Sequence, residues 1–570
     1  MSADQHNEDV KVLHSMGYAQ ELSRRMGLFQ NFAISFSIIC ILAGGIGAYA
    51  VGLGAAGGGS IGIGWIVGSV FALIVAAAMG QIASAYPTAG GIYHWASILG
   101  GKGWGWGAAW LNLLGLLFVV SSVNYGVVLL FRDLVYYPIL GAAPDSFTPT
   151  VLTIAVALIT ATQAYLNYVG IKITTILTDV AGYIIFAISV IIIVSLVAWS
   201  PVELDFSRLT NFTNYTGDPG AGSWPQTGSL FFAFILGLLH VCYTITGFDA
   251  SGHTSEETRD AQRSVPKGMI TSVFWSGLFG WFLVVAILLA MPSVDDGAKQ
   301  GFGVFAWVLG QSHMPDAIKV LIAVGIVVSN YLCALAGMTS LSRMMYAFSR
   351  DGGIPLVSQY LRRVSPKYRT PGTAIAVGAV LCFILGWACG QDARAYIILA
   401  SGCAVFLYAS YIMPIGAGIL AEGKTWTKKG PFNLGGLSKP VAVLAVLGGG
   451  VLAFVGFQPP YQLVGQFLAY AIIALIVIWQ PRTIALVVAA AGIILAYFWF
   501  QPETGWTTVA EGALLGLPPI VWLAIGAVIL LALAFVGERE RFAGPPLTPE
   551  AVAKRQAEIA REEAALGGAG

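Results

Sequence analysis

The residues best placed to do chemistry lie within one apolar segment, at about residues 229–254. The stretch Tyr243-Thr-Ile-Thr-Gly-Phe-Asp-Ala-Ser251 holds a carboxylate, Asp249, beside a helix-weakening glycine, Gly247. In a lipid bilayer every backbone N–H and C=O needs a partner, so a spanning helix is broken only where it lines a cavity or a ligand. An ionisable group at that depth is costly unless it is paired. The stretch therefore predicts a binding site for a polar solute. The alternative is that the helix ends near Gly247 and Asp249 caps the next turn in water.

A second interruption is predicted earlier in the chain, at Ala43-Gly-Gly-Ile-Gly47. Each glycine weakens a helix by about 1 kcal/mol and exposes backbone N–H groups. An unwound helix presents these groups to an anion such as a carboxylate. Small residues also let membrane helices pack closely, so the glycines alone do not decide between packing and binding. Two broken helices at corresponding positions of two halves are typical of the substrate site of a secondary transporter.

The composition is that of a membrane protein. Of 570 residues, 57% are hydrophobic and 10% are charged, and the mean hydropathy is +0.78. Soluble domains carry roughly 25% charged residues. The net charge of +1 argues against a nucleic-acid partner. Cysteines lie in apolar segments without disulfide or metal spacing, and no nucleophile or paired acid and base is evident. We therefore expect no enzyme activity, no metal site and no cofactor.

The hydropathy pattern predicts an all-α polytopic membrane protein of about fourteen transmembrane helices, since each span needs about twenty apolar residues. The predicted spans are residues 30–52, 64–84, 104–131, 149–169, 172–198, 229–254, 266–290, 316–346, 372–390, 394–420, 440–457, 461–480, 482–500 and 517–537. An even number of spans places both termini on one side. The positive-inside rule places them in the cytoplasm, because few of the 29 lysines and arginines then lie on the outer side. Those few are Arg132, Arg208, Lys299, Lys319 and Arg394.

Two further features lie close to the predicted spans. The stretch Tyr86-Pro-Thr-Ala-Gly-Gly-Ile-Tyr-His-Trp95 is too punctuated for a span and too apolar for a solvated loop, which predicts an interfacial or re-entrant segment. A second carboxylate, Asp179, lies about seven residues into the fifth span, roughly 10 Å from its end. At that distance it is either a residue of the inner vestibule or a side chain that reaches water.

Four stretches together resemble the amino acid–polyamine–organocation superfamily, most closely its amino acid/choline transporter branch. The sixth-span motif is Gly247-Phe-Asp-Ala-Ser-Gly-His-Thr-Ser-Glu-Glu-Thr-Arg-Asp-Ala-Gln-Arg-Ser-Val-Pro-Lys-Gly268. The other three are Tyr86-Pro-Thr-Ala-Gly-Gly-Ile-Tyr-His-Trp95, Ser342-Arg-Met-Met-Tyr-Ala-Phe-Ser-Arg-Asp-Gly352 and Leu407-Tyr-Ala-Ser-Tyr-Ile-Met-Pro414. The resemblance covers about residues 25–480.

This resemblance implies a leucine-transporter-like fold, a five-plus-five inverted repeat in which spans one and six are broken. The ten-helix core would be residues 30–420, with repeat one at 30–198 and repeat two at 229–420. A cytoplasmic tail at 1–29 would precede it. Spans eleven and twelve at 440–480, two additional spans at 482–537 and a cytoplasmic tail at 538–570 would follow it. Relatives typically have twelve spans, so the last two are a departure.

The resemblance also assigns site residues. They are Gly44, Gly45, Gly47, Tyr243, Thr244, Ile245, Thr246, Phe248, Asp249, Asn330 and Ser401. The three glycines would offer N–H groups to a substrate carboxylate, and the carbonyls of residues 244–246 would take an ammonium group. Phe248 would be an aromatic gate. Asp249 would attract the amine or take part in proton coupling.

The expected function is that of a plasma-membrane carrier that imports an amino acid or a related small amine with protons. Some proton-coupled relatives carry a lysine in span five, whereas the apolar part of that span here, residues 180–197, has none. Sodium is the alternative coupling ion, with hydroxyl ligands from Thr339 and Ser340. A choline or polyamine transporter and a transporter-like membrane sensor are compatible with the same sequence.

Overall fold

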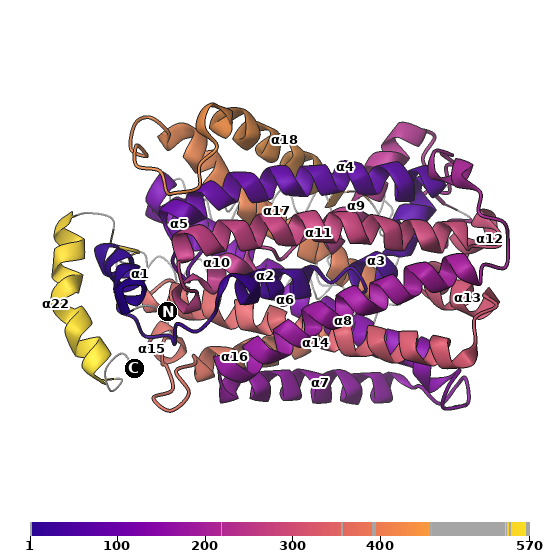
Figure 1. Cartoon of the computed structure of the whole chain (residues 1–570), viewed down its shortest axis with the longest axis horizontal. Helices are drawn as coiled ribbons and strands as arrows, with labels where there is room; N and C mark the ends of the chain where they lie inside the picture. The colour runs from indigo at the N-terminus through magenta and orange to yellow at the C-terminus, as the bar shows by residue number, and fades with distance from the viewer. Residues whose placement is uncertain are drawn as a thin grey trace, which may run out of the picture.

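The computed structural model describes residues 3–217, 219–354, 357–389, 395–456, 458, 542, 544–546 and 549–565. Throughout these ranges the regular structure is helical, and the only β-type pairings are two isolated bridges. The long helices run side by side along the long axis of the molecule (Figure 1). The predicted spans at 461–480, 482–500 and 517–537 lie outside the described residues.

Among the described residues, nine helices are long and apolar enough to cross a membrane. The first half of the bundle consists of α2 (Leu28–Ile39), α3 (Gly44–Gly47), α4 (Tyr49–Ala85), α6 (Lys102–Phe131), α7 (Pro149–Val169) and α8 (Ile171–Ala198). The second half consists of α9 (Leu230–Thr244), α10 (Ala250–His253), α11 (Ala261–Leu289), α14 (Asp316–Arg350), α16 (Gly372–Cys389), α17 (Ala395–Ala421) and α18 (Ser438–Gly456). The outer faces of α7, α8 and α18 expose apolar side chains such as Leu158, Val194 and Leu447. Such a surface suits contact with lipid.

The boundary between the first two spans differs from the prediction. Helix α4 joins the end of span one to span two, and its backbone leaves the helical region at Ala56 and Gly57 rather than across the predicted gap at 53–63. Gly57 has a φ of 67°, which a residue with a side chain rarely adopts. A Cβ on the next residue, Gly58, would collide with the carbonyl of Arg208. The glycines after residue 56 therefore allow the backbone to turn and allow the loop at residues 208–213 to approach it closely.

Both chain termini lie at one end of the bundle, here called the terminal end (Figure 1). The elements gathered there are α1 (Ala3–Ser15), α5 (Ile92–Gly100), η3 (Ser255–Glu257), α15 (Ser358–Leu361) and α22 (Pro549–Ala565). The opposite end carries η1 (Arg132–Tyr136), η2 (Phe206–Leu209), α12 (Val294–Ala298), η4 (Gly301–Gly303) and α13 (Val304–Gln311). Helices α1 and α22 touch, and His14 Nε2 lies 2.9 Å from Glu563 Oε1.

The stretch at residues 86–95 is buried inside the protein rather than lying at an interface with lipid. Trp95 is fully buried, and its indole N–H donates to the carbonyl of Tyr86 at 2.8 Å. Helix α5 packs between α6 and α17. Of the two predicted alternatives, the interfacial segment is therefore wrong, because an interfacial helix would keep one face open to the headgroups, whereas burial is compatible with a re-entrant segment.

Candidate binding site at two broken helices

The first broken helix is interrupted at residues 40–43, between α2 and α3. Cys40 closes α2 with a φ of 28°, an unusual left-handed value for a residue with a side chain. The expected unwinding at residues 43–47 is therefore displaced by three residues, and the glycines themselves form the single turn α3. The reason is local: the N–H groups of Gly44 and Gly47 bond to the carbonyls of Cys40 and Ala43, at 3.2 and 2.8 Å.

Several backbone N–H groups around this break lack an acceptor. Among the described residues, no carbonyl or side chain accepts from the N–H groups of Ile41, Leu42, Gly45 and Ile46. Of the three predicted cradle glycines, Gly45 thus keeps a free donor, whereas Gly44 and Gly47 do not. Buried donors of this kind are rarely left unpaired in proteins, so they mark a place where an acceptor can bind.

The second broken helix is interrupted at residues 245–249, between α9 and α10, as the sequence predicts. Gly247 has a φ of 83°, and a Cβ there would collide with the side chain of Ile38. The carbonyls of Ile245 and Phe248 are occupied by the hydroxyls of Tyr408 and Ser35, at 2.7 and 2.9 Å. By contrast, the last three carbonyls of α9, on Cys242, Tyr243 and Thr244, accept no hydrogen bond from the described residues. The carbonyl of Thr246, within the break, accepts none from them either.

The two breaks face each other. A Cβ on Gly44 would lie 2.6 Å from Thr244 Oγ1 and 2.7 Å from Thr244 Cα, so only glycine permits this approach. One turn earlier on α9, His240 Nε2 lies 3.1 Å from the carbonyl oxygen of Gly45. Free N–H groups on one helix and free carbonyls on the other therefore lie together, which suits a solute with both an anionic and a cationic group.

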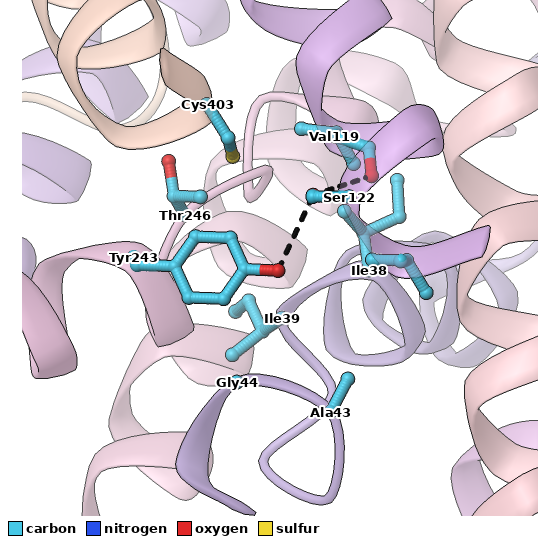
Figure 2. A pocket seen from close by; sticks show the side chains of 10 residues that line it. Ile38, Ile39, Ala43, Gly44, Val119, Ser122, Tyr243, Thr246 and Cys403 are labelled. Atoms are coloured by element: carbon cyan, nitrogen blue, oxygen red, sulfur yellow. Dashed lines mark hydrogen bonds between the residues drawn. The ribbon is translucent and has the colours of Figure 1, made fainter. Parts of the chain in front are cut away.

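A small cavity lies between the breaks (Figure 2). Its lining residues are Ile38, Ile39, Ala43, Gly44, Val119, Ser122, Val123, Tyr243, Thr246 and Cys403. The Tyr243 hydroxyl points across it and donates to Ser122 Oγ at 3.3 Å. The free space holds about one water molecule, so the side chains are closed around it. A larger solute requires Tyr243 and its neighbours to move apart.

Asp249 lies beside this cavity in a polar cage and is 1% exposed. Its Oδ1 accepts from the Tyr411 hydroxyl at 2.8 Å. Its Oδ2 accepts from Asn112 Nδ2 at 2.9 Å and lies 3.0 Å from His253 Nε2. The Tyr411 hydroxyl also accepts from the Gly247 N–H at 3.1 Å, which ties the carboxylate to the break itself. Asp249 is therefore a fully bonded carboxylate inside the bundle rather than a cap in open water.

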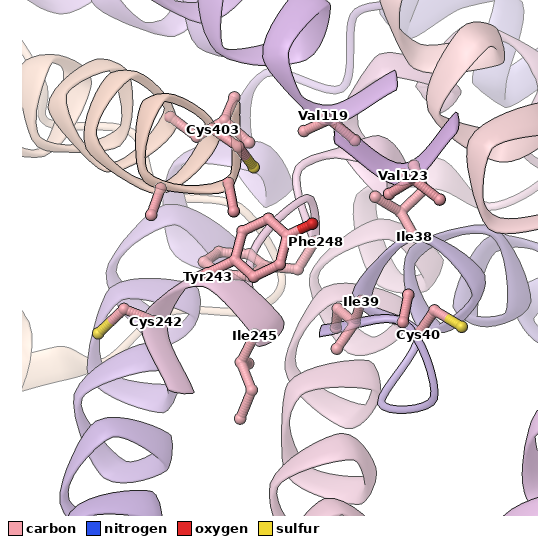
Figure 3. Packing of buried hydrophobic residues seen from close by; sticks show 14 of the residues in the cluster. Ile38, Ile39, Cys40, Val119, Val123, Cys242, Tyr243, Ile245, Phe248 and Cys403 are labelled. Carbon is pink, nitrogen blue, oxygen red and sulfur yellow. The ribbon is translucent and has the colours of Figure 1, made fainter. Parts of the chain in front are cut away.

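Phe248 does not line the cavity. It is fully buried and packs against the rings of Tyr408 and Tyr411, with centroids 6.4 and 5.0 Å away. Figure 3 shows the packing around Tyr243, with Ile38, Ile39 and Cys40 on one side and Cys403 on another. In this conformation Tyr243 lines the cavity and Phe248 does not.

The other predicted residues lie outside the cavity lining. Asn330 and Ser401 bond to their own helices, to the carbonyls of Ile326 and Ile398 at 2.8 and 3.0 Å. Cys403, on the same helix as Ser401, lines the cavity instead.

The predicted sodium ligands differ in their surroundings. The Thr339 hydroxyl donates to Asn167 Oδ1 at 2.7 Å, on α7. The Ser340 hydroxyl is buried and has no partner among the described residues. Asp179 lies on α8, where Gln30 Nε2 donates to it at 3.2 Å.

Sequence reasoning missed the cage around Asp249. His253 could have been found, because a residue four positions after Asp249 shares its helix face. Asn112 and Tyr411 come from spans three and ten, and no local pattern links them to Asp249. Tyr411 does fall within the motif at residues 407–414, which could have marked it.

Buried ion pairs seal the terminal end below Asp249. Arg350 and Glu256 pair at 2.9 Å, and Arg343 and Glu257 pair at 3.1 Å. Burial would raise the pKa of Glu256, but the charge and hydrogen bonds of Arg350 and the N–H of Ala89 hold that pKa below its ordinary value. For Glu257 the effect of burial outweighs that of Arg343, and its pKa is raised. The pairs connect η3 to α14.

The N-terminal tail completes this seal. The N–H groups of Arg25 and Met26 donate to the carbonyl of Glu257 at 2.9 and 2.8 Å. Arg24 lies nearby, where its guanidinium donates to the carbonyl of Ser255 at 3.1 Å. The N-terminal tail is therefore bound directly to η3 at the terminal end.

Comparison with known proteins finds relatives that are described as permeases. A family model described as amino acid permease matches residues 26–479. Amino-acid permease BAT1 of Arabidopsis thaliana is 30% identical over 452 residues, which are 76% of this chain and 85% of the relative. The GABA-specific permease of Saccharomyces cerevisiae is 29% identical over 450 residues, 76% of this chain and 75% of the relative.

Among solved structures, the crystal structure of MhsT in complex with L-phenylalanine matches with a TM-score of 0.50 and 13% identity. The match covers 78% of this chain and 99% of that one. At this identity the likeness concerns the fold, which is that of a leucine-transporter-like protein.

Proposed function

This chain belongs to the amino acid permease family, and on that premise we propose that it carries an amino acid or a related small amine across the plasma membrane by alternating access, together with protons. The observation that carries the proposal is the pair of helix breaks that meet at Gly44 and Thr244. They bring unpaired backbone N–H groups, on residues next to Ala43 and Gly44, close to a cavity that is lined by Tyr243 and Thr246, whose carbonyls are unpaired. A membrane helix keeps such groups only where a solute or water satisfies them.

The chemistry of the breaks favours a substrate with a carboxylate and an ammonium group. The carboxylate would accept from the free N–H groups of Gly45 and Ile46, and the ammonium would donate to the free carbonyls that end α9. Choline and polyamines have no carboxylate and would leave the buried donors unpaired, at a cost of about 1–3 kcal/mol per group. An α-amino acid or γ-aminobutyrate therefore fits better, and one relative is a GABA-specific permease.

The orientation follows from charge. With the terminal end in the cytoplasm, the buried arginine and glutamate pairs and the N-terminal tail form the inner seal, and the η2 to α13 region faces outward. Most lysines and arginines then lie on the inner side, as the positive-inside rule requires.

Protons are the favoured coupling ion because a fully buried carboxylate, Asp249, lies at the second break and shares the Tyr411 hydroxyl with Gly247. Sodium is favoured by one observation only, the unpartnered Ser340 hydroxyl, while the Thr339 hydroxyl is already bonded. Replacement of sodium by potassium separates the two: uptake is expected to persist in potassium and to respond to a pH gradient.

The test of the substrate class is a thermal-shift screen followed by counterflow in proteoliposomes. Amino acids and γ-aminobutyrate should raise the melting temperature, because a ligand that binds only the folded state stabilises it by mass action. Choline and putrescine should not. Counterflow of a labelled hit shows transport and separates a carrier from a sensor. Stabilisation by choline or putrescine alone would contradict the proposal.

A further inference from the structure

Both ring nitrogens of His253 face hydrogen-bond acceptors. Nε2 lies 3.0 Å from the Asp249 carboxylate, and Nδ1 lies 3.3 Å from the carbonyl oxygen of Ala89. A neutral imidazole has one N–H and one lone pair, so it can satisfy only one of these acceptors. The protonated ring has two N–H groups and satisfies both. His253 and Asp249 are both buried, with side chains 0% exposed.

The charge of a protonated His253 is balanced by Asp249 rather than by any other neighbour. On η3, Glu256 and Glu257 are already paired with Arg350 and Arg343. On α5, His94 pairs with Asp351, 3.2 Å away.

The remaining neighbours of the pair carry no formal charge. From α17, the Tyr411 hydroxyl donates to Asp249, and Cys403 lies close to that carboxylate. From α6, the Asn112 amide donates to it. Within the described part of the chain, no arginine or lysine forms an ion pair with Asp249, so His253 is the group that can supply a positive charge to it.

The loop at residues 86–95 approaches the His253 ring closely at Ala89 and Gly91. Gly91 has a φ of 44°, and a Cβ there would lie 3.2 Å from His253 Nδ1, tighter than ordinary packing. The Ala89 N–H donates to Glu256 Oε1 at 3.0 Å, so the same peptide segment joins His253 to the inner seal. The stretch at residues 86–95 thus brings a backbone carbonyl, rather than a side chain, to the imidazole.

From this geometry we propose that His253 holds the coupling proton, with Asp249 as its fixed counter-charge, and that the proton fastens the 86–95 loop against α10. The proposal rests on the proposed function and adds the site of the proton. With the proton bound, Nε2–H donates to Asp249 and Nδ1–H donates to Ala89, which keeps the inner seal closed. When the seal opens to water, the imidazolium releases one proton to the cytoplasm, and the neutral ring no longer holds Ala89. The empty carrier then returns with His253 neutral.

The test separates exchange from net uptake in proteoliposomes. Counterflow cycles a loaded carrier and needs no release of the proton, whereas accumulation driven by a pH gradient does. With one proton per substrate, a gradient of one pH unit drives about tenfold accumulation in the wild type. His253→Gln keeps one amide donor and cannot titrate. It is expected to retain counterflow, but the substrate concentration inside should not rise above the concentration outside. His313→Gln is the matched control, because His313 is exposed at the opposite end and should keep the wild-type accumulation.

Accumulation by His253→Gln equal to that of the wild type would overturn the proposal. A second measurement covers a variant that does not fold: titration calorimetry of the wild type in buffers of different ionisation enthalpy. Substrate binding near neutral pH should take up protons, and binding without proton uptake would also overturn the proposal. Wild-type counterflow with accumulation that ignores the pH gradient would leave the carrier function standing and would remove both proton coupling and the role of His253. Absence of wild-type counterflow for every substrate in the panel would instead remove the transport function.

Discussion

Gly44 and Thr244 come from spans one and six, yet they are so close that a single methyl group does not fit between them. A Cβ on Gly44 would lie 2.6 Å from the Thr244 hydroxyl oxygen and 2.7 Å from its Cα. Because Thr244 is the last residue of α9 and Gly44 the first of α3, this contact sets the spacing between the unpaired N–H groups and the unpaired carbonyls. The geometry of the site depends on it.

Gly44→Ala should therefore weaken substrate binding. The added methyl group meets backbone on Thr244, which cannot rotate away, so the two breaks must separate. We expect a loss of affinity of at least about tenfold, equivalent to about 1.4 kcal/mol, measured by ligand-induced thermal shift. Gly182→Ala on α8 is the control, since its Cβ would lie 3.9 Å from the Cβ of Ala33. Unchanged affinity in Gly44→Ala would show that the substrate binds elsewhere.

Asp249→Asn should abolish uptake. The carboxylate accepts from Tyr411, Asn112 and His253, and an amide group would oppose at least one of these donors with a donor of its own. The expected loss is at least about tenfold in uptake rate by protein that remains folded in size-exclusion chromatography. The matched control is the other intramembrane carboxylate: Asp179→Asn loses one bond of 3.2 Å and should transport. Normal uptake by Asp249→Asn would remove the carboxylate from the mechanism.

Cys403 offers a direct probe of where the substrate lies. Cys403 lines the cavity, whereas Cys382 lies outside that lining. The Cys382 thiol donates to the carbonyl of Leu117 on α6. Saturating substrate should therefore slow the modification of Cys403 by a methanethiosulfonate reagent, read by mass spectrometry. The rate at Cys382 should not change. Equal protection of both thiols would indicate a general closure of the protein instead of occupancy of the cavity.

The buried ion pairs at the terminal end should contribute more to stability than an exposed pair. Removal of one partner from a buried ion pair leaves an uncompensated charge and destabilises a protein by about 3–5 kcal/mol. Arg343→Met does this to Glu257, since both side chains are 0% exposed. The exposed pair of Lys299 and Asp296 provides the comparison, and Lys299→Met should change stability far less. The melting temperatures of the two variants in detergent test this difference. Equal decreases for Arg343→Met and Lys299→Met would contradict the prediction.

Asp351 should make the terminal end sensitive to acid. Burial would raise the pKa of Asp351, but hydrogen bonding to His94, the charges of His94 and Arg350 and the Tyr18 hydroxyl hold it below its ordinary value. A carboxylate whose pKa is lower in the folded state than in the unfolded state stabilises the folded state. This stabilisation is complete above the unfolded-state pKa and is lost as the pH falls through the folded-state pKa. The melting temperature of the wild type should therefore fall more steeply below about pH 4 than that of Asp351→Asn. Parallel curves would show that Asp351 does not contribute.

The helical membrane architecture, the family and the second break could all be predicted from the order of the residues. Long apolar segments leave the backbone no alternative to helix in lipid, so the membrane helices of the described residues could be located from hydropathy. The break at Gly247 was predictable because the chain there needs a φ of 83°, which glycine adopts and other residues resist. Asp249 was also found, since an ionisable residue in an apolar run stands out on its own.

The position of the first break and the surroundings of the carboxylate depend instead on how the helices pack. The glycines at 44–47 remain helical because two of their N–H groups find carbonyls within the same turn, and the strain falls on Cys40 instead. Asn112 and Tyr411 lie 137 and 162 positions from Asp249 in the chain. The side-chain pattern of a helix shows which residues share a face, but which faces of distant spans meet is set by how whole helices pack against one another.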